Sequence, residues 1–256
     1  LFRSRRWLTA AGATLGSLWL ASCDKLVANS TFNGVLKVAE TWTRGAQRLV
    51  TDRKALAAEF TAADLSKDFK ANGTLRPQDP DYQAMLGENF ASYRLEIGGL
   101  VERPLSLSLA DVRAAPARTQ ITRHDCVEGW SSIGKWKGAR LSALLDRAKL
   151  KPQARYIVFH CADTLDPSAT DGAGKYYESI DLIDAYHPQT ILAYEMNDAT
   201  LPVRHGAPLR LRVERQLGYK HAKYVMRIEA VEALDGIGRG AGGFWPDRGY
   251  EWYAGI

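Results

Sequence analysis

Cysteine is scarce in this chain of 256 residues, which has three cysteines and neither a CxxC nor a CxxCH pattern. These absences remove the usual spacings of zinc sites and of covalently attached haem. No GxGxxG or P-loop sequence occurs, and no internal repeat is found. The common sequence signatures of dinucleotide and nucleoside-triphosphate binding are therefore missing.

Long apolar runs and a strong excess of charge are also lacking. Beyond the N-terminus no stretch approaches the roughly 20 apolar residues that span a bilayer. The formal net charge is +5, but Arg3, Arg5 and Arg6 lie in the first 22 residues, which contain no acid. The rest of the chain has 31 basic and 29 acidic side chains, a net charge of +2. Without a basic stripe or a recognised motif, nucleic acid is not an expected partner.

The first 22 residues have the pattern of an export signal. Ser4-Arg5-Arg6-Trp7-Leu8 is a twin-arginine sequence, and a moderately apolar run follows it up to Leu20. The run ends in Leu20-Ala21-Ser22-Cys23, which resembles the lipobox of bacterial lipoproteins, where the cysteine is acylated. The sequence thus predicts twin-arginine export to the periplasm and a lipid anchor on Cys23. The alternative is an ordinary cleaved signal with an incidental cysteine.

Residues 23–75 are predicted to form a helical tether between the anchor and a main domain. Apolar residues recur there at or near helical spacing; they are Leu36, Ala39, Trp42, Ala46, Leu56, Phe60 and Leu65. A partly disordered spacer is the alternative. Asn72-Gly73, Pro77 and Pro80 break the pattern, so the main domain is predicted over residues 76–256.

Many short strands and few helices are predicted in the main domain. The expected strands are 93–101, 105–107, 120–122, 156–159, 191–196, 209–213 and 224–231. The expected helices are 109–114, capped by Ser108, then 141–149 and 179–185. Residues 163–174 are expected to form a surface loop, and 236–256 an irregular wrap. Because no βαβ rhythm is present, the predicted fold class is α+β and not a Rossmann sheet.

The stretch from Thr122 to Gly138 (TRHDCVEGWSSIGKWKG) presents Cys126 between a charged run and a predicted turn. That turn is rich in residues that permit tight bends or give aromatic surface, namely Gly129, Trp130, Gly134, Trp136 and Gly138. A cysteine in this setting can be a nucleophile, a metal ligand, half of a disulfide or merely buried. A disulfide with Cys161, a zinc site with nearby histidines and a Cys–His hydrolase are all open alternatives.

A second group of residues occupies two glycine-containing loops beside the strand expected at 209–213. The segments are Leu201–Arg210 (LPVRHGAPLR) and Gly218–Lys223 (GYKHAK), and their cations are Arg204, Arg210, Lys220 and Lys223. Cations beside a closely approaching backbone suit an organic cofactor that carries a phosphate. A solvated charged rim is the alternative.

Three motifs in order, CVEGWS with KWKG, then HGAPLRL and GYKHAKY, resemble the sulfite-oxidase-like family of molybdopterin oxidoreductases. The resemblance runs from about Phe90 to Glu232 and is nearest to the exported branch that includes periplasmic methionine-sulfoxide reductase catalytic subunits. It implies the sulfite-oxidase-like α+β core of mixed sheets, without the C-terminal immunoglobulin-like domain of full sulfite oxidases. It also implies a molybdenum-molybdopterin cofactor and two-electron oxygen-atom transfer.

The resemblance assigns roles to individual residues. Cys126 stands at the position of the only protein ligand to molybdenum. Arg204 is implied as a catalytic residue. The residues implied as cofactor-binding are Asn89, Cys161, His205, Arg210, His221, Ala222 and Lys223. Cys161 stands where relatives carry a small hydroxyl residue, and His205 where the reductase branch has an amide.

The resemblance also implies partners. Since no haem motif is present, electrons must be exchanged with another protein, which in the reductase branch is a membrane b-type cytochrome. A lipid anchor would hold the enzyme beside it, and a monomer is expected because the dimerisation domain is not found. The segment after Cys126 has no base, which favours a neutral S- or N-oxide, or a methionine-sulfoxide protein, over sulfite. Sulfite oxidation and a lipid-anchored non-enzymatic binding module are the alternatives.

Overall fold

The computed structural model describes residues 38–39, 42–43, 45–47, 49, 52–171 and 173–256. The chain divides into two compact units, Leu1–Thr51 and Asp52–Ile256. In the first unit the described residues are helical, as expected around Ala39, Trp42 and Ala46. The twin-arginine sequence and Cys23 lie outside the described residues, so the export signal and the anchor stay predictions. In the described part of the chain, no helix combines the length and the apolar character that a membrane crossing requires.

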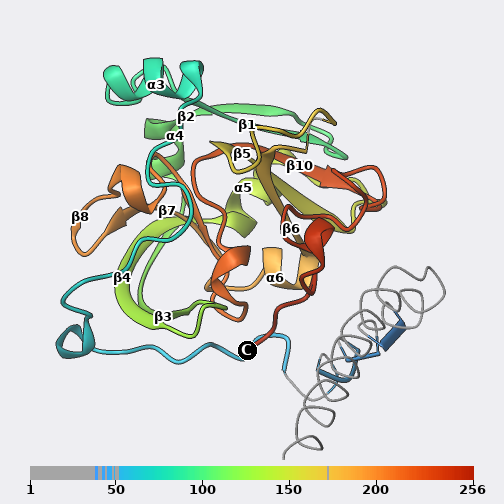
Figure 1. Ribbon diagram of the computed structural model, residues 1–256, viewed down its shortest axis with the longest axis horizontal. Helices are drawn as coiled ribbons and strands as arrows, with labels where there is room; N and C mark the ends of the chain where they lie inside the picture. Colours follow the sequence, from blue (N-terminus) through green and yellow to red (C-terminus); the bar gives the residue numbers. More distant parts are fainter. Residues whose placement is uncertain (1–37, 40–41, 44, 48, 50–51, 172) are drawn as a thin grey trace, which may run out of the picture. The chain divides into compact units, whose positions relative to one another are not determined.

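The second unit contains two five-stranded sheets (Figure 1). The first sheet has the order β2-β1-β10-β5-β6, and only the β1–β10 pair is parallel. Its strands are β1 (Arg94–Gly99), β2 (Leu105–Ser108), β5 (Tyr156–Thr164), β6 (Lys175–Asp181) and β10 (Val225–Val231). The second sheet is antiparallel with the order β3-β4-β7-β8, and β9 also pairs with β7. Its strands are β3 (Ala117–Asp125), β4 (Ser131–Arg140), β7 (Ile191–Met196), β8 (Ala199–Thr200) and β9 (Arg210–Arg212).

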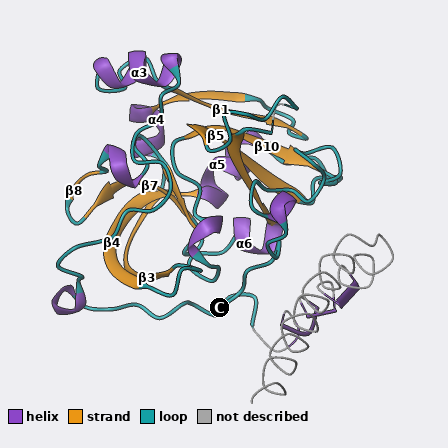
Figure 2. Ribbon diagram, in the orientation of Figure 1, coloured by secondary structure: helices purple, strands orange, loops and turns teal. Residues whose placement is uncertain are grey.

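Helices are short and lie between or beside the sheets (Figure 2). The α-helices of the second unit are α3 (Pro80–Gly87), α4 (Leu109–Ala114), α5 (Leu141–Ala148) and α6 (Leu182–Ala185). The 3-10 turns are η1 (Ala62–Asp64), η2 (Val203–His205), η3 (Gly218–Lys220) and η4 (Pro246–Arg248). Two sheets with few helices confirm the predicted α+β class.

Local chemistry explains the elements that the sequence predicts well. Ser108 and Asp111 form a reciprocal capping box at the start of α4, where the Ser108 hydroxyl accepts the Asp111 amide at 3.1 Å. Helix α5 buries Leu141, Leu144, Leu145 and Ala148 at helical spacing. One continuous apolar core is shared by α5 and both sheets; it includes Leu95 and Ile97 of β1, Phe159 of β5 and Ile191 of β7.

Residues 52–75, called the strap below, are not the helix that their apolar spacing predicts. Apart from η1 the strap has no helix, and Glu59 forms a β-bridge with Thr122 of β3. The Gln189 side chain accepts the Ala57 amide at 2.8 Å and donates to the Ala57 carbonyl at 3.0 Å. These distant partners satisfy the backbone in an extended form, so tertiary contacts override helical spacing. Leu56 is exposed and not on a buried helix face.

Two further predictions were wrong in part. The glycine-rich segment up to Gly138 is not a turn, because Ser131–Arg140 forms the long strand β4. Gly138 allows β4 to lie close to β7, because a Cβ at this position would be 2.2 Å from the Leu192 carbonyl oxygen. The helix expected at 179–185 begins only at Leu182, because β6 continues through Asp181.

Candidate functional site

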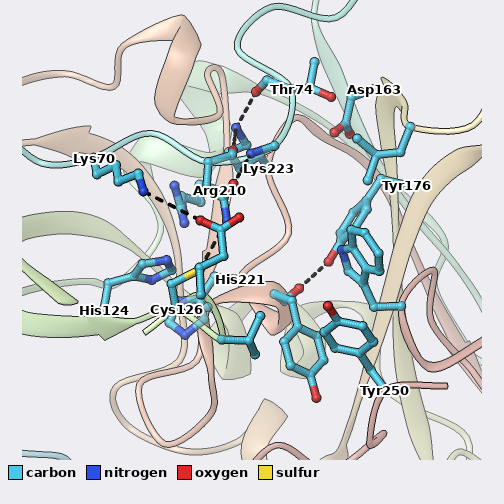
Figure 3. A pocket seen from close by; sticks show the side chains of 18 residues that line it. Lys70, Thr74, His124, Cys126, Asp163, Tyr176, Arg210, His221, Lys223 and Tyr250 are labelled. Carbon is cyan, nitrogen blue, oxygen red and sulfur yellow. Dashed lines mark hydrogen bonds and ion pairs between the residues drawn. The ribbon is translucent and has the colours of Figure 1, made fainter. Parts of the chain in front are cut away.

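A cavity opens in the second unit with an empty volume of about 910 Å³, measured out to its open mouth. Its walls combine the turn after β3, the end of β5, η3, the strap and the C-terminal wrap. Figure 3 shows Cys126, Arg210, His221 and Lys223 on one side of it, with Tyr176 and Tyr250 opposite.

Cys126 lines this cavity at the start of the tight turn that joins β3 to β4. Its amide donates to the Trp130 carbonyl at 2.9 Å, and its carbonyl accepts the Gly129 amide at 3.0 Å. Gly129 takes a φ of +82°, which favours glycine. The Asn72 side-chain amide donates to the Cys126 Sγ at 3.2 Å. The turn and Asn72 together fix the direction of a thiol that is 8% exposed.

Cys161 lies on β5 and does not share a disulfide with Cys126, since both thiols are free. That alternative is excluded. Burial, with the Asp163 carboxylate nearby, raises the pKa of the Cys161 thiol well above its ordinary value. Cys161 is buried behind the wall and is not one of the residues that line the cavity. It is therefore a protonated packing residue rather than a second reactive thiol.

Two cations face the cavity, as the sequence predicts: Arg210 is buried and Lys223 is partly buried. Arg210, at the start of β9, donates to the His205 carbonyl at 3.1 Å, and burial followed by the charge of Arg212 lowers its pKa to about 9. Lys223 donates to the Asn72 carbonyl at 2.7 Å and also to the Thr74 carbonyl. Burial, and to a lesser extent the positive charge of Arg210, lowers the pKa of Lys223 to about 7. An anion placed between them would relieve this mutual repulsion.

His221 and His124 form the floor beside Cys126. Their rings meet edge to face at 5.0 Å between centroids. The His221 Nε2 lies 2.9 Å from the Gln216 carbonyl, and the Arg212 guanidinium lies 3.1 Å from the His124 Nδ1. Burial, and to a lesser extent the charges of nearby arginines, lowers the pKa of both imidazoles well below the ordinary value. Both rings are therefore neutral. Ala222, next to His221, is buried, and its carbonyl accepts the Leu211 amide at 2.8 Å.

Several buried polar atoms around the cavity have no hydrogen-bond partner among the described residues. They are the Asp163 Oδ1, the His205 Nδ1, the Arg210 Nε and the His221 Nδ1. Buried polar atoms in folded proteins are almost always paired. Asp163, Arg210 and His221 line the cavity itself, beside a thiol and two cations. These cations and unpartnered polar atoms fit an anionic organic group that is rich in hydrogen-bonding atoms. The Cys126 thiol beside them could ligate a metal that this group carries.

Besides Cys161 and Ala222, three sequence-predicted residues do not line the cavity. Arg204 is exposed and pairs with Asp68 at 3.2 Å, so the structure does not support a catalytic position for it. Asn89 is exposed just after α3, with a φ of +51° that ends the helix, and is not part of the cavity wall. His205 is buried behind Arg210, with its Nε2 accepting from Arg204 at 3.1 Å.

Other lining residues were missed by the sequence analysis. Asn72 was interpreted only as a chain breaker, although an amide beside a glycine also suits a loop that approaches a ligand. Asp163 was placed in a surface loop, but it is 3% exposed. Burial raises its pKa to about 6. Lys70 on the strap and Trp245 on the wrap complete the wall, and no local signal predicted either.

Residues 83–235 match the family described as "Oxidoreductase molybdopterin binding domain". The chain belongs to this family. It is therefore an oxidoreductase with a molybdenum-molybdopterin cofactor, as the sequence resemblance implied. The predicted sulfite-oxidase-like core is confirmed, and the donor set of the cavity fits that cofactor. In the described part of the chain no three His, Cys, Asp or Glu side chains gather to hold a metal ion, so the zinc alternative has no support.

Curated relatives of this molybdopterin oxidoreductase carry reductase names. The chain is 33% identical to a provisionally named protein-methionine-sulfoxide reductase subunit, YedZ1, of Azospira oryzae, covering 98% of this chain and 88% of the relative. It is 33% identical to the protein-methionine-sulfoxide reductase catalytic subunit MsrP of Campylobacter jejuni (56% of this chain, 51% of the relative). It is 34% identical to MsrP of Xanthomonas axonopodis pv. citri (73% and 61%). The chain thus spans about half to three fifths of the length of these two MsrP proteins.

Among solved structures, the sulfane dehydrogenase SoxCD of Paracoccus pantotrophus is similar, with a TM-score of 0.48 and 24% sequence identity. The match covers 56% of this chain and 39% of that chain.

Proposed function

We propose that this molybdopterin oxidoreductase reduces S- or N-oxides, with Cys126 as the protein ligand of molybdenum. The observation that carries the proposal is the oriented Cys126 thiol, which faces a cavity lined by the cations Arg210 and Lys223 and by several unpartnered polar atoms. When bound, the cofactor supplies the two-electron oxygen-atom transfer. The overall reduction converts a sulfoxide, two electrons and two protons into a sulfide and water.

The chain's own residues have distinct tasks in this proposal. Arg210 and Lys223 would hold the phosphate of the pterin, Arg210 through its planar guanidinium group and Lys223 as a compact charge. His221 is neutral and offers its unpartnered Nδ1 to the pterin. Asn72 orients the Cys126 thiol. Asp163, whose pKa burial raises to about 6, can hold one of the required protons on its unpartnered Oδ1.

The cavity mouth favours a neutral oxide over sulfite. The turn after Cys126 brings no base, and the nearest added cation, Lys70, lies 3.7 Å from the Glu128 carboxylate. A dianion would need several free cations converging on it. Trp136, which the sequence placed in an aromatic turn, does not contribute to the mouth, because it is fully buried in the core. The apolar surface comes instead from Tyr219, Trp245 and Tyr250.

Location and partners belong to the same proposal. The twin-arginine sequence supports export of a folded, cofactor-loaded protein to the periplasm, and the lipobox supports an anchor on Cys23. We infer a membrane b-type cytochrome as electron donor, because the sequence has no haem motif, and a monomeric enzyme beside it. A methionine-sulfoxide protein is the substrate suggested by the names of the relatives.

The test uses purified protein with its molybdenum content measured per chain. Reduction of methionine sulfoxide with a reduced viologen is expected, with poor oxidation of sulfite by an artificial acceptor. Efficient sulfite oxidation with no reduction of any oxide would overturn the proposed direction and substrate class.

A further inference from the structure

Four aromatic side chains line the cavity, and we call them the aromatic wall: Tyr176, Tyr219, Trp245 and Tyr250. Several of these rings contact one another. The Trp245 and Tyr250 centroids are 5.1 Å apart, and those of Tyr219 and Tyr250 are 5.3 Å apart. Phe244 packs behind, 5.8 Å from Tyr176 and 5.3 Å from Trp245. Tyr219, Tyr250 and Trp245 thus form one run of contacting rings, and Figure 3 shows Tyr250 on the same side of the cavity as Tyr176.

Half of this wall lies outside the part of the chain that matches the family. The match ends at residue 235, whereas Trp245 and Tyr250 belong to the wrap that follows. By contrast, the Cys126 thiol and the two cations of the cavity, Arg210 and Lys223, lie within the match. Trp245 and Tyr250 are therefore additions to the matched domain, which itself contains the residues that face the cofactor.

Contacts away from the cavity hold the wrap in place. Arg248 pairs with Asp166 at 3.1 Å, and Arg239 pairs with Asp171 at 2.7 Å. The Asp247 carboxylate accepts the Ala241 amide at 2.6 Å. These anchors mean that the rings need little ordering when something binds against them, which favours affinity.

The cavity therefore has two unlike sides. The side near Cys126 carries polar and charged groups, including Arg210 and Lys223, whereas the opposite side carries Tyr176 and Tyr250. A sulfoxide is itself two-sided, with a polar S–O bond and carbon substituents. Orientation of the S–O bond toward Cys126 would place one substituent on the wall.

We propose that Trp245 and Tyr250 are specificity-determining residues that bind an apolar, preferably aryl, substituent of the substrate. This inference rests on the proposed reduction of oxides. It assigns the choice among oxides to the wrap and the binding of cofactor to the matched domain.

The experiment compares kcat/KM for methyl p-tolyl sulfoxide with that for dimethyl sulfoxide, in molybdenum-loaded enzyme. Tyr250→Ala and Trp245→Ala are each expected to lower this ratio about tenfold, mainly through KM of the aryl substrate. Tyr250→Phe keeps the ring and is expected to keep the ratio. Tyr186→Ala is the matched control, because Tyr186 is 40% exposed, much like Tyr250 at 39%, and does not line the cavity.

A second readout does not depend on turnover. Binding of methyl p-tolyl sulfone, followed by calorimetry, is expected to weaken about tenfold in Tyr250→Ala and to be unchanged in Tyr186→Ala. An unchanged ratio and unchanged sulfone binding in both alanine variants, with normal molybdenum content, would overturn the inference. If the wild type reduced no sulfoxide, the proposed function would fail, and the sulfone titration alone would decide whether the wall binds aryl groups.

Discussion

The Lys223 ammonium lies 2.7 Å from the Asn72 carbonyl, which ties the strap to the residues that precede β10. The same asparagine donates its side-chain amide to the Cys126 Sγ at 3.2 Å. One loop of the strap thus connects the cation and the thiol of the cavity, although the two lie almost one hundred residues apart in sequence. A substitution at Lys223 is therefore expected to shift the Cys126 thiol, and a substitution at Cys126 to shift the Lys223 ammonium.

Cys126→Ser is expected to lose molybdenum and activity while the fold is kept. A serine hydroxyl is a poor ligand for a soft metal, but it fits the space and can still accept the Asn72 amide. Molybdenum per chain by elemental analysis and the circular-dichroism melt measure the two effects. Cys161→Ser is the matched control, and it should retain metal. Full activity in Cys126→Ser would end the proposed ligation.

Arg210→Met and Lys223→Met are each expected to reduce cofactor retention roughly ten- to one-hundred-fold, because each removes a charge-assisted contact. The readout is the cofactor released on stepwise dilution or dialysis. Lys137→Met removes a cation of the exposed face, 3.2 Å from Glu195, and should have no effect. Equal retention in all three variants would contradict a phosphate cradle at these two residues.

Stability is expected to fall as pH drops from 6.5 to about 4, in part because of His205. Burial and the charge of Arg210 lower the pKa of this imidazole from 6.5 to about 4. The unfolded chain binds the proton below pH 6.5 while the folded protein stays neutral, so acid favours unfolding in this window. Urea unfolding across it should show a steeper loss in the wild type than in His205→Gln, by at most about 1.4 kcal/mol per pH unit. If the free energy of unfolding fell equally with pH in the wild type and in His205→Gln, a buried neutral His205 would be contradicted.

Gly138→Ala is expected to destabilise the second unit by about 2 kcal/mol or more, because the new methyl group would meet the Leu192 carbonyl at 2.2 Å. Gly98→Ala is the control, since Gly98 also lies in a strand but has open space around it. Thermal unfolding of both variants measures the difference. If both melted alike, the close approach of β4 and β7 would not be a constraint.

Cys23→Ala tests the anchor. Expressed with its signal, the wild-type protein is expected to sediment with membranes and the variant to be released or left unprocessed, because acylation requires the thiol. Cys161→Ala, which leaves the lipobox intact, should behave as the wild type does. Soluble wild-type protein that begins at Asp24 or later would rule out the anchor.

The sequence predicted best what neighbouring residues determine. The capping box at Ser108 and the apolar face of α5 are local, and both elements formed where expected. The cavity residues Cys126, Arg210, His221 and Lys223 were identified from motifs. Asn72 was missed because its contact with Cys126 joins residues 54 positions apart.

The errors have the same origin. The helix expected around Leu56 did not form because β3 and Gln189 offered the backbone other partners. Trp136 was interpreted as part of a loop, yet the alternation of Lys135, Trp136 and Lys137 is that of a strand with one buried face. A reading of that alternation would have placed the indole in the core.

The strap has a consequence for where this protein can be cut. β3 is the outermost strand of its sheet, and such strands recruit other chains unless they are covered. Phe60 donates its amide to the Ile121 carbonyl at 2.9 Å, beside the bridge from Glu59, and so covers that edge. A fragment that began at residue 83, where the family match begins, would expose it. We expect that fragment to self-associate, whereas one that begins at Asp52 should stay monodisperse.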